Sequence, residues 1–393
     1  MLKIKSRYII NLIFENISEE KYLRLIKYNK KIQNILDKSL KDYKEYNQIE
    51  IELIPISNYK NEDKFINRLN KDKSFIHIYL NIYFNNYTNN YKRREFNCCR
   101  LESKTKISRI RIIIDNEIKS LKGLFKNCKC LKEINIIKCK RKDINDMSEI
   151  FYGCKNLNKL NLLNLKTDKV TDMSYMFSEC SSLINIDLTN FNTSNVTNMQ
   201  NMFEKCSNLT QLNLNNFNTS NVIYMNDMFS ECSSLNSINI DNFNTSNVIN
   251  MSYMFYNCSH LTKLNINNFD TSKVRDMSYM FYNCCILTCL NLSNFNTKKT
   301  INMSNMFYKC LELIELDISK LDIKNETRIK FMFSYCPLEL QNKIKNKIKN
   351  INNDAFDESK EIHPKLDFSK FYTCDLYSYE REPYNSDDDD ENL

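Results

Sequence analysis

The residues best suited to chemistry in this sequence are its 16 cysteines. Nine of them recur at intervals of 26 residues, from Cys128 to Cys336, and each lies three residues after a phenylalanine. A thiol can act as a nucleophile or as a metal ligand. The sequence has only three histidines, however, and it contains no nucleophile motif and no paired spacing of zinc ligands. We therefore expect no enzymatic activity and no bound metal.

Disulfide bonds are the remaining chemistry that the nine cysteines could support. Their number is odd, and each holds the same position in its repeat, which is a poor arrangement for pairing. Reduced cysteine is among the most buried residue types and packs as a small apolar side chain. We expect the nine thiols to be reduced and to lie in a core, with a disulfide framework as the alternative.

Composition excludes several other classes of function. The only two glycines, Gly123 and Gly153, leave no glycine-rich loop for a nucleotide, so we expect no cofactor. The net charge of +8 is modest for 393 residues and the lysines are dispersed, which argues against a nucleic-acid partner. Because no apolar run is long enough to span a bilayer and no export signal is evident, we expect a cytoplasmic location.

The phenylalanines that precede the cysteines keep the 26-residue step without a slip. A fixed period of this length indicates stacked supersecondary units, each of which buries its apolar face on its neighbours. The series consists of Phe125, Phe151, Phe177, Phe203, Phe229, Phe255, Phe281, Phe307 and Phe333.

One unit illustrates the fold that we expect in each repeat. The apolar residues between Met199 and Cys206 have the i, i+3, i+4, i+7 spacing of one face of a short helix. The asparagine or aspartate that usually precedes the first methionine would cap this helix. The Leu-x-x-Leu-x-Leu pattern that begins at Leu209 predicts a short strand with one buried face.

The stretch from Phe191 to Leu209 (FNTSNVTNMQNMFEKCSNL) resembles the BspA-like leucine-rich repeats, best known from bacterial and protist surface proteins. The pattern recurs in nearly every unit from about Gly123 to Cys336. The resemblance implies an α/β fold, a leucine-rich-repeat-like solenoid with a short strand and a short helix in each 26-residue coil. It also implies that the repeat surface binds protein.

The segments that flank the repeats are expected to close the solenoid. The pattern of Ile107, Ile110 and Ile112 predicts a degenerate first coil. The expected organisation is a helical module at 1–45, a strand-rich connection at 46–106, the solenoid at 107–336, a C-terminal cap helix at 337–352 and a mostly disordered acidic tail at 353–393.

The helical module at residues 1–45 resembles an F-box. The resemblance implies a substrate adaptor of a ubiquitin ligase, in which Ile10, Ile13 and Phe14 contact a ligase subunit. The alternative is a helical cap that seals the first coil and has no partner.

Two surfaces of the solenoid are candidates for partner binding. The first, the polar row, is the residue between the last two leucines of each strand, which stacking would align. Bonding of these side chains to one another is the structural alternative. The polar row consists of Asn161, Asp187, Asn213, Asn239, Asn265, Asn291 and Asp317.

The second candidate, the tyrosine surface, lies on the outer side of three successive repeats. Tyrosine is enriched at protein interfaces, and aromatic packing between repeats is the alternative. The tyrosine surface consists of Tyr253, Tyr256, Tyr279, Tyr282 and Tyr308. We predict a protein-interaction scaffold, with the ligase adaptor as its more specific form. A BspA-like adhesin at the cell surface, bound to a host or matrix component, is the alternative.

Overall fold

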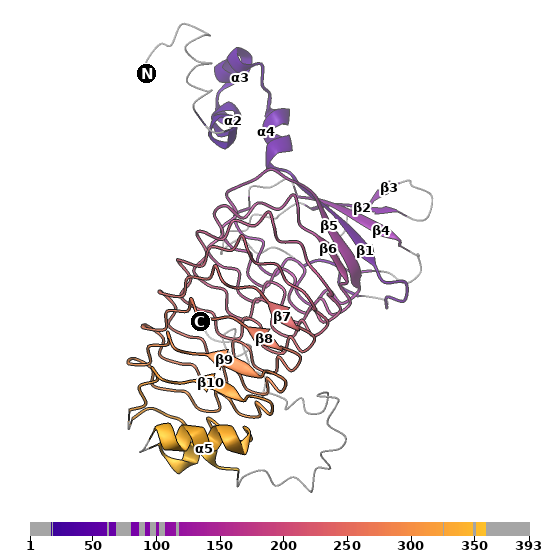
Figure 1. Ribbon diagram of the computed structural model, residues 1–393. Helices are drawn as coiled ribbons and strands as arrows, with labels where there is room; N and C mark the ends of the chain where they lie inside the picture. Colours follow the sequence, from indigo (N-terminus) through magenta and orange to yellow (C-terminus); the bar gives the residue numbers. More distant parts are fainter. Residues whose placement is uncertain are drawn as a thin grey trace, which may run out of the picture. The chain divides into compact units, whose positions relative to one another are not determined.

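The computed structural model describes residues 17, 19–60, 63–67, 80–85, 91–94, 100–101, 107–114, 118–324, 326–348 and 351–358. Along the chain, a helical segment is followed by a mixed β-sheet, a long series of repeats and a single α-helix (Figure 1). The acidic run that begins at Ser386 lies outside the described residues.

The helical segment consists of α2 (Glu19–Tyr28), α3 (Lys30–Leu36) and α4 (Leu40–Asn47). The Asn29 side chain caps α3, and Ser39 and Asp42 form a reciprocal capping box at the start of α4. The segment has a small core of its own, separate from the main core of the molecule. Its buried residues are Leu23, Ile26, Tyr43 and Tyr46.

A six-stranded sheet with the order β3-β2-β4-β1-β5-β6 joins this segment to the repeats. Its strands are β1 (Ile49–Pro55), β2 (Leu80–Asn85), β3 (Tyr91–Arg94), β4 (Arg109–Ile114), β5 (Leu131–Cys139) and β6 (Lys159–Asn161). β1 runs antiparallel to both β4 and β5, whereas β6 runs parallel to β5. The expectation of a first coil at Ile107 is therefore corrected, because β4 is antiparallel to its neighbours. Alternating isoleucines indicate one buried face but not strand direction.

Successive turns replace the short helix that we expected in each repeat. In the repeat around Phe177, the N–H of Met176 donates to the C=O of Met173 at 3.3 Å, and the N–H of Cys180 donates to Phe177 at 3.1 Å. The N–H of Phe177 itself donates to the C=O of Met202 in the next repeat, at 2.9 Å. In an α-helix every backbone N–H would donate to the C=O four residues earlier in the same segment. Because the N–H of Phe177 donates to the next repeat instead, the segment is not an α-helix.

Left-handed backbone at two positions of each repeat, four residues apart, accompanies these turns. The φ angle is 54° at Tyr175 and 59° at Glu179, and the same two positions are left-handed in every later repeat up to Tyr335. A turn of four residues brings methionine, phenylalanine and cysteine to the inner side, as a helix of 3.6 residues per turn does. The apolar pattern therefore fits either structure.

Short parallel contacts connect the strand positions of neighbouring repeats. β7 (Ser237–Ile238) pairs with β8 (Lys263–Leu264), and β9 (Cys289–Asn291) pairs with β10 (Glu315–Asp317). Parallel bridges at the 26-residue step also connect the repeats from Asp146 to Arg328. The repeats are thus stacked in parallel, and we call residues 119–336 the repeat stack.

The predicted phenylalanine ladder forms the centre of the core. Each ladder phenylalanine has 0% of its surface exposed. Neighbouring ring centroids are 5.4–5.8 Å apart, and the ring planes lie within 16° of parallel. The sequence prediction of a buried phenylalanine at every repeat is confirmed.

The ladder thiols from Cys154 to Cys336 are buried and form no disulfide. Each donates from Sγ to the carbonyl of a phenylalanine 29 residues earlier, at 3.1–3.2 Å. Burial raises the pKa of Cys206 and of Cys258 to about 12, so the thiols keep the proton that they donate. The cysteines therefore connect repeats as well as filling space.

The last repeat is followed by α5 (Leu338–Lys347) and by η1, a short 3₁₀ helix (Asn353–Phe356). The Phe356 ring stacks on Phe333 at 5.7 Å, and the N–H of Phe333 donates to the C=O of Ala355 at 2.7 Å. The predicted start of a disordered tail at residue 353 is therefore wrong, because residues 353–358 pack on the repeat stack. This added layer lacks the 26-residue spacing that marks the others.

Candidate functional site

The polar row occupies the same position in successive repeats, and its side chains are exposed or half-buried. Each side-chain oxygen accepts the backbone N–H two residues later, at 2.9–3.2 Å. This geometry is an Asx-turn, which fixes the chain where it leaves the strand. At Asp187, the Thr189 hydroxyl and N–H lower the pKa of the carboxyl group. The row thus has a local structural role in the turns.

Another asparagine position, which the sequence analysis did not single out, bridges the repeats. The Nδ2 group of Asn216 donates to the carbonyls of Leu188 at 3.0 Å and Phe191 at 2.8 Å in the preceding repeat. Asn242 makes the same bond to Phe217 at 2.7 Å. In most repeats this asparagine directly precedes an inward-facing phenylalanine. That constant placement is the sequence signal that could have identified it.

A buried threonine also joins each repeat to the next. The Thr219 hydroxyl donates to the C=O of Asn244 at 2.9 Å and accepts the N–H of the same residue at 2.8 Å. Thr193 makes the equivalent pair of bonds to Asn218. One buried side chain thus satisfies two backbone groups of the next repeat.

The structure brings the tyrosine surface together as two stacks. Tyr253 and Tyr279 have ring centroids 4.5 Å apart and planes 5° apart. Tyr256, Tyr282 and Tyr308 form the second stack, with steps of 4.9 and 4.8 Å. Tyr308 is 8% exposed and the other four are half-buried. Burial raises the pKa of Tyr279. The arrangement is a fixed aromatic surface with one side in contact with solvent.

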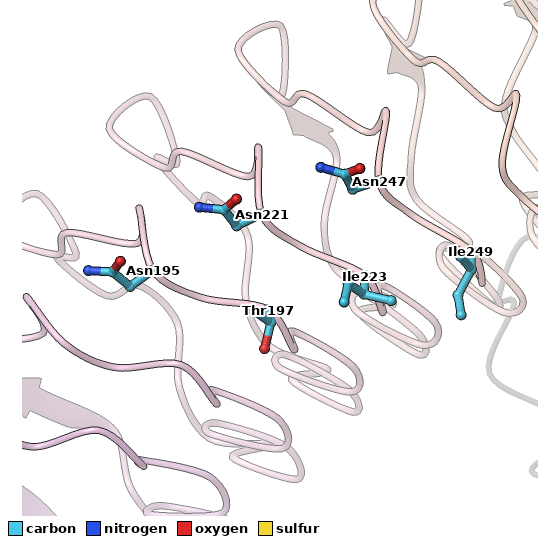
Figure 2. Close-up of a pocket in the computed structure, with 6 residues that line it drawn as sticks. All are labelled: Asn195, Thr197, Asn221, Ile223, Asn247 and Ile249. Atoms are coloured by element: carbon cyan, nitrogen blue, oxygen red, sulfur yellow. The ribbon is translucent and has the colours of Figure 1, made fainter.

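An open groove of about 490 Å³, which we call the edge groove, lies along the turns that precede each Met-x-x-Met-Phe segment. Figure 2 shows its side chains in two lines, each of which takes one residue from each of three successive repeats. The lining residues are Asn195, Thr197, Asn221, Ile223, Asn247 and Ile249. Sequence analysis did not identify this groove, because isoleucines spaced 26 residues apart at a turn resemble ordinary core residues.

The predicted ligase contact, Ile10, Ile13 and Phe14, lies outside the described residues. The nearby helices are described, and Arg24 of α2 forms an ion pair with Asp143 at 2.9 Å. Because Arg24 is half exposed, this pair adds little to stability.

A membrane-spanning helix and a metal centre are two further kinds of site that the described part of the chain could contain. None of its helices combines the length and apolar character that a membrane span requires. Its histidine, cysteine and carboxylate side chains do not gather in groups of three or more that could hold a metal ion.

Comparison with known proteins identifies the family. Residues 119–238, 178–287 and 225–347 each match the family described as "Mycoplasma protein of unknown function, DUF285". Together these matches span residues 119–347, more than half of the chain. The search of curated proteins gives no match. The overlapping matches coincide with the stacked 26-residue repeats, and the chain therefore belongs to the DUF285 family of BspA-like repeat proteins.

Proposed function

We propose that this chain is a protein-interaction scaffold, a leucine-rich-repeat-like solenoid that binds a partner through its tyrosine surface. The proposed role is binding without catalysis, in the cytoplasm. Membership of the repeat family supports a binding role, since repeat stacks present extended surfaces to partners.

The observation that carries the proposal is the pair of tyrosine stacks. Tyr253 and Tyr279, 4.5 Å apart, hold each other in place before any partner arrives. Rings that are already ordered lose little conformational entropy on binding. Each phenol also combines an apolar face with a hydrogen-bonding group, which suits a partly wet interface.

Affinity capture from the native cells tests this proposal. Full-length protein, a Tyr279→Ser/Tyr282→Ser variant and an Asn239→Ala/Asn265→Ala variant in the polar row would be compared. We expect the wild type and the polar-row variant to retain one specific partner, and the tyrosine variant to lose it by about tenfold or more. Retention by the tyrosine variant, or the absence of any partner above the bead control, would contradict the proposal.

The ligase adaptor is a second, more specific proposal. The separate core of α2–α4 favours an independent module over a cap, because a cap would share its apolar residues with the first repeat. The test is capture of a ligase subunit by full-length protein and its loss in an Ile10→Ser/Ile13→Ser/Phe14→Ser variant. Equal capture by both proteins, or capture by neither, would reject the adaptor role.

The surface adhesin is the alternative to both proposals. Protease treatment of intact cells distinguishes it, because a cytoplasmic protein is protected until the cells are lysed. Digestion in intact cells would reject the cytoplasmic proposal.

A further inference from the structure

The edge groove is the apolar part of a longer strip along one edge of the repeat stack. Ile223 and Ile249 line the groove on neighbouring repeats, each half-buried. Next to them, Tyr224 is 41% exposed, and it stands where most repeats have the asparagine or aspartate of an Asx-turn. Ile301, two repeats beyond Ile249, is 62% exposed. Apolar side chains thus face solvent at the same position of three repeats.

Backbone hydrogen bonds show that the strip is continuous. The N–H of Ile249 donates to Ile223 at 3.0 Å, and the N–H of Arg275 donates to Ile249 at 2.9 Å. The series continues from Ile301 to Arg275 at 2.9 Å and from Arg328 to Ile301 at 3.0 Å. Residues far apart in the sequence are therefore consecutive along this edge.

The C-terminal half of the strip is cationic. Its basic side chains are exposed, and among the described carboxylates none lies within the 4.0 Å of an ion pair with them. They are Lys273, Arg275, Lys298, Lys299, Lys324 and Arg328. Some lysines elsewhere on the stack do form ion pairs, as Lys155 does with Glu179 at 3.1 Å.

Carboxylates on the same segments offset only part of this positive charge. They are fewer, namely Asp270, Asp276, Asp322 and Glu326. Asp270 and Asp276 accept the backbone N–H groups of Ser272 and Ser278, at 2.9 and 2.8 Å, so one oxygen of each carboxylate is bonded within its own turn. Six cations against four carboxylates leave these segments with a net charge of +2, which can attract an acidic ligand.

We propose that this edge strip binds an extended acidic segment of a partner protein, whose apolar side chains enter the edge groove and whose carboxylates meet the cationic half. Five steps of about 4.8 Å separate Thr197 from Arg328, about 24 Å in all, which about seven extended residues span. The exposed cations favour a partner segment that carries carboxylates. Ile223 and Ile249, which line the groove, favour apolar side chains in that segment. This surface is distinct from the tyrosine surface.

Fluorescence anisotropy with the full-length protein tests the inference. The probe is a labelled peptide of alternating leucine and glutamate, about twelve residues long, which exceeds the length of the strip. We expect salt-sensitive binding. A glutamate-only peptide and a single-stranded oligothymidine of similar length are expected to bind at least about tenfold more weakly, since neither can fill the groove. Equal binding of either competitor would show a general polyanion surface and overturn the inference.

Matched variants locate the site. Arg275→Glu/Lys299→Glu should weaken peptide binding about tenfold or more, whereas Lys263→Glu, an exposed lysine on β8, should leave it unchanged. Ile223→Ser/Ile249→Ser should weaken binding while the salt dependence persists. Equal loss in the Lys263→Glu control would overturn the inference. The Tyr279→Ser/Tyr282→Ser variant should bind the peptide normally, so failure of this inference is distinguishable from failure of the tyrosine proposal.

Discussion

The phenylalanine ladder and the tyrosine surface are two aromatic stacks built on the same 26-residue period. The phenylalanines have no exposed surface and continue through every repeat, whereas the tyrosines are mostly half-buried and occupy only three repeats. Ring separations are 5.4–5.8 Å in the ladder and 4.5–4.9 Å between stacked tyrosines. Stacking itself therefore follows from the close spacing of the repeats.

What separates the two stacks is their access to water. A ring buried on both faces contributes its full apolar area to folding. A half-buried ring contributes less to folding and keeps one side for a partner. The comparison assigns stability to the ladder and recognition to the tyrosines, and the following predictions test that division from the largest expected effect to the smallest.

Alkaline pH should destabilise the core most strongly. The pKa of Cys206 is about 12 in the folded protein against an ordinary value of 9.0. Below pH 9.0 the thiol is protonated in both the folded and the unfolded protein, and the fold has its full stability. Between pH 9.0 and 12 the unfolded chain loses this proton while the folded protein keeps it, so the free energy of unfolding falls as the pH rises. Each such thiol loses on the order of 1.4 kcal/mol per pH unit in this window. Urea unfolding at a series of pH values measures the effect.

The matched control for the alkaline effect is Tyr256→Phe, which removes a phenol from the tyrosine surface and should leave the pH profile unchanged. Stability that stays constant up to about pH 10.5 would contradict the role of the protonated thiols.

Truncation of a ladder ring should have the next largest effect. Phe229→Ala removes a ring stacked on both sides, and it should lower the free energy of unfolding by about 3–5 kcal/mol. Tyr256→Ala should cost about 1 kcal/mol, the worth of a half-exposed aromatic contact. Asn239→Ala, which removes one Asx-turn, should also cost far less than Phe229→Ala. If denaturant unfolding gives similar losses in the free energy of unfolding for Phe229→Ala and Tyr256→Ala, the two stacks do not differ in their contribution to stability.

The threonine bridge should have an intermediate effect. Thr219→Val keeps the shape of the side chain but leaves the N–H and C=O of Asn244 without their partner. We expect a loss of about 1–3 kcal/mol. Ser220→Ala in the same turn should change stability by about 0.5 kcal/mol or less. Equal thermal shifts for the two variants would show that the buried bridge is not needed.

The tyrosine surface should give the smallest change in stability. Tyr279→Ser should lower the melting temperature by only a few degrees, in line with about 1 kcal/mol for a partly exposed ring. Calorimetry provides the measurement. A loss as large as that of Phe229→Ala would mean that the tyrosines are part of the core, and it would weaken their assignment to binding.

Much of the candidate site could be located from the sequence, but its chemistry could not. The five tyrosines were placed together because their spacing follows the repeat. The polar row repeats at the predicted 26-residue spacing, yet its oxygens accept local N–H groups, a choice that depends on the backbone turn that follows each of these residues. The edge groove escaped notice because its depth depends on the relative placement of side chains from three repeats.

The sequence by itself determined the period and the identity of the core residues, because identical apolar residues at identical spacing must be buried in identical ways. It did not determine whether the Met-x-x-Met-Phe-x-x-Cys segment is a helix. That was decided by bonds such as the one from Phe177 to Met202, whose partners lie 25 residues apart. A backbone N–H is the same in every residue, so only the three-dimensional stacking selects between a partner in the same turn and a partner in the next repeat.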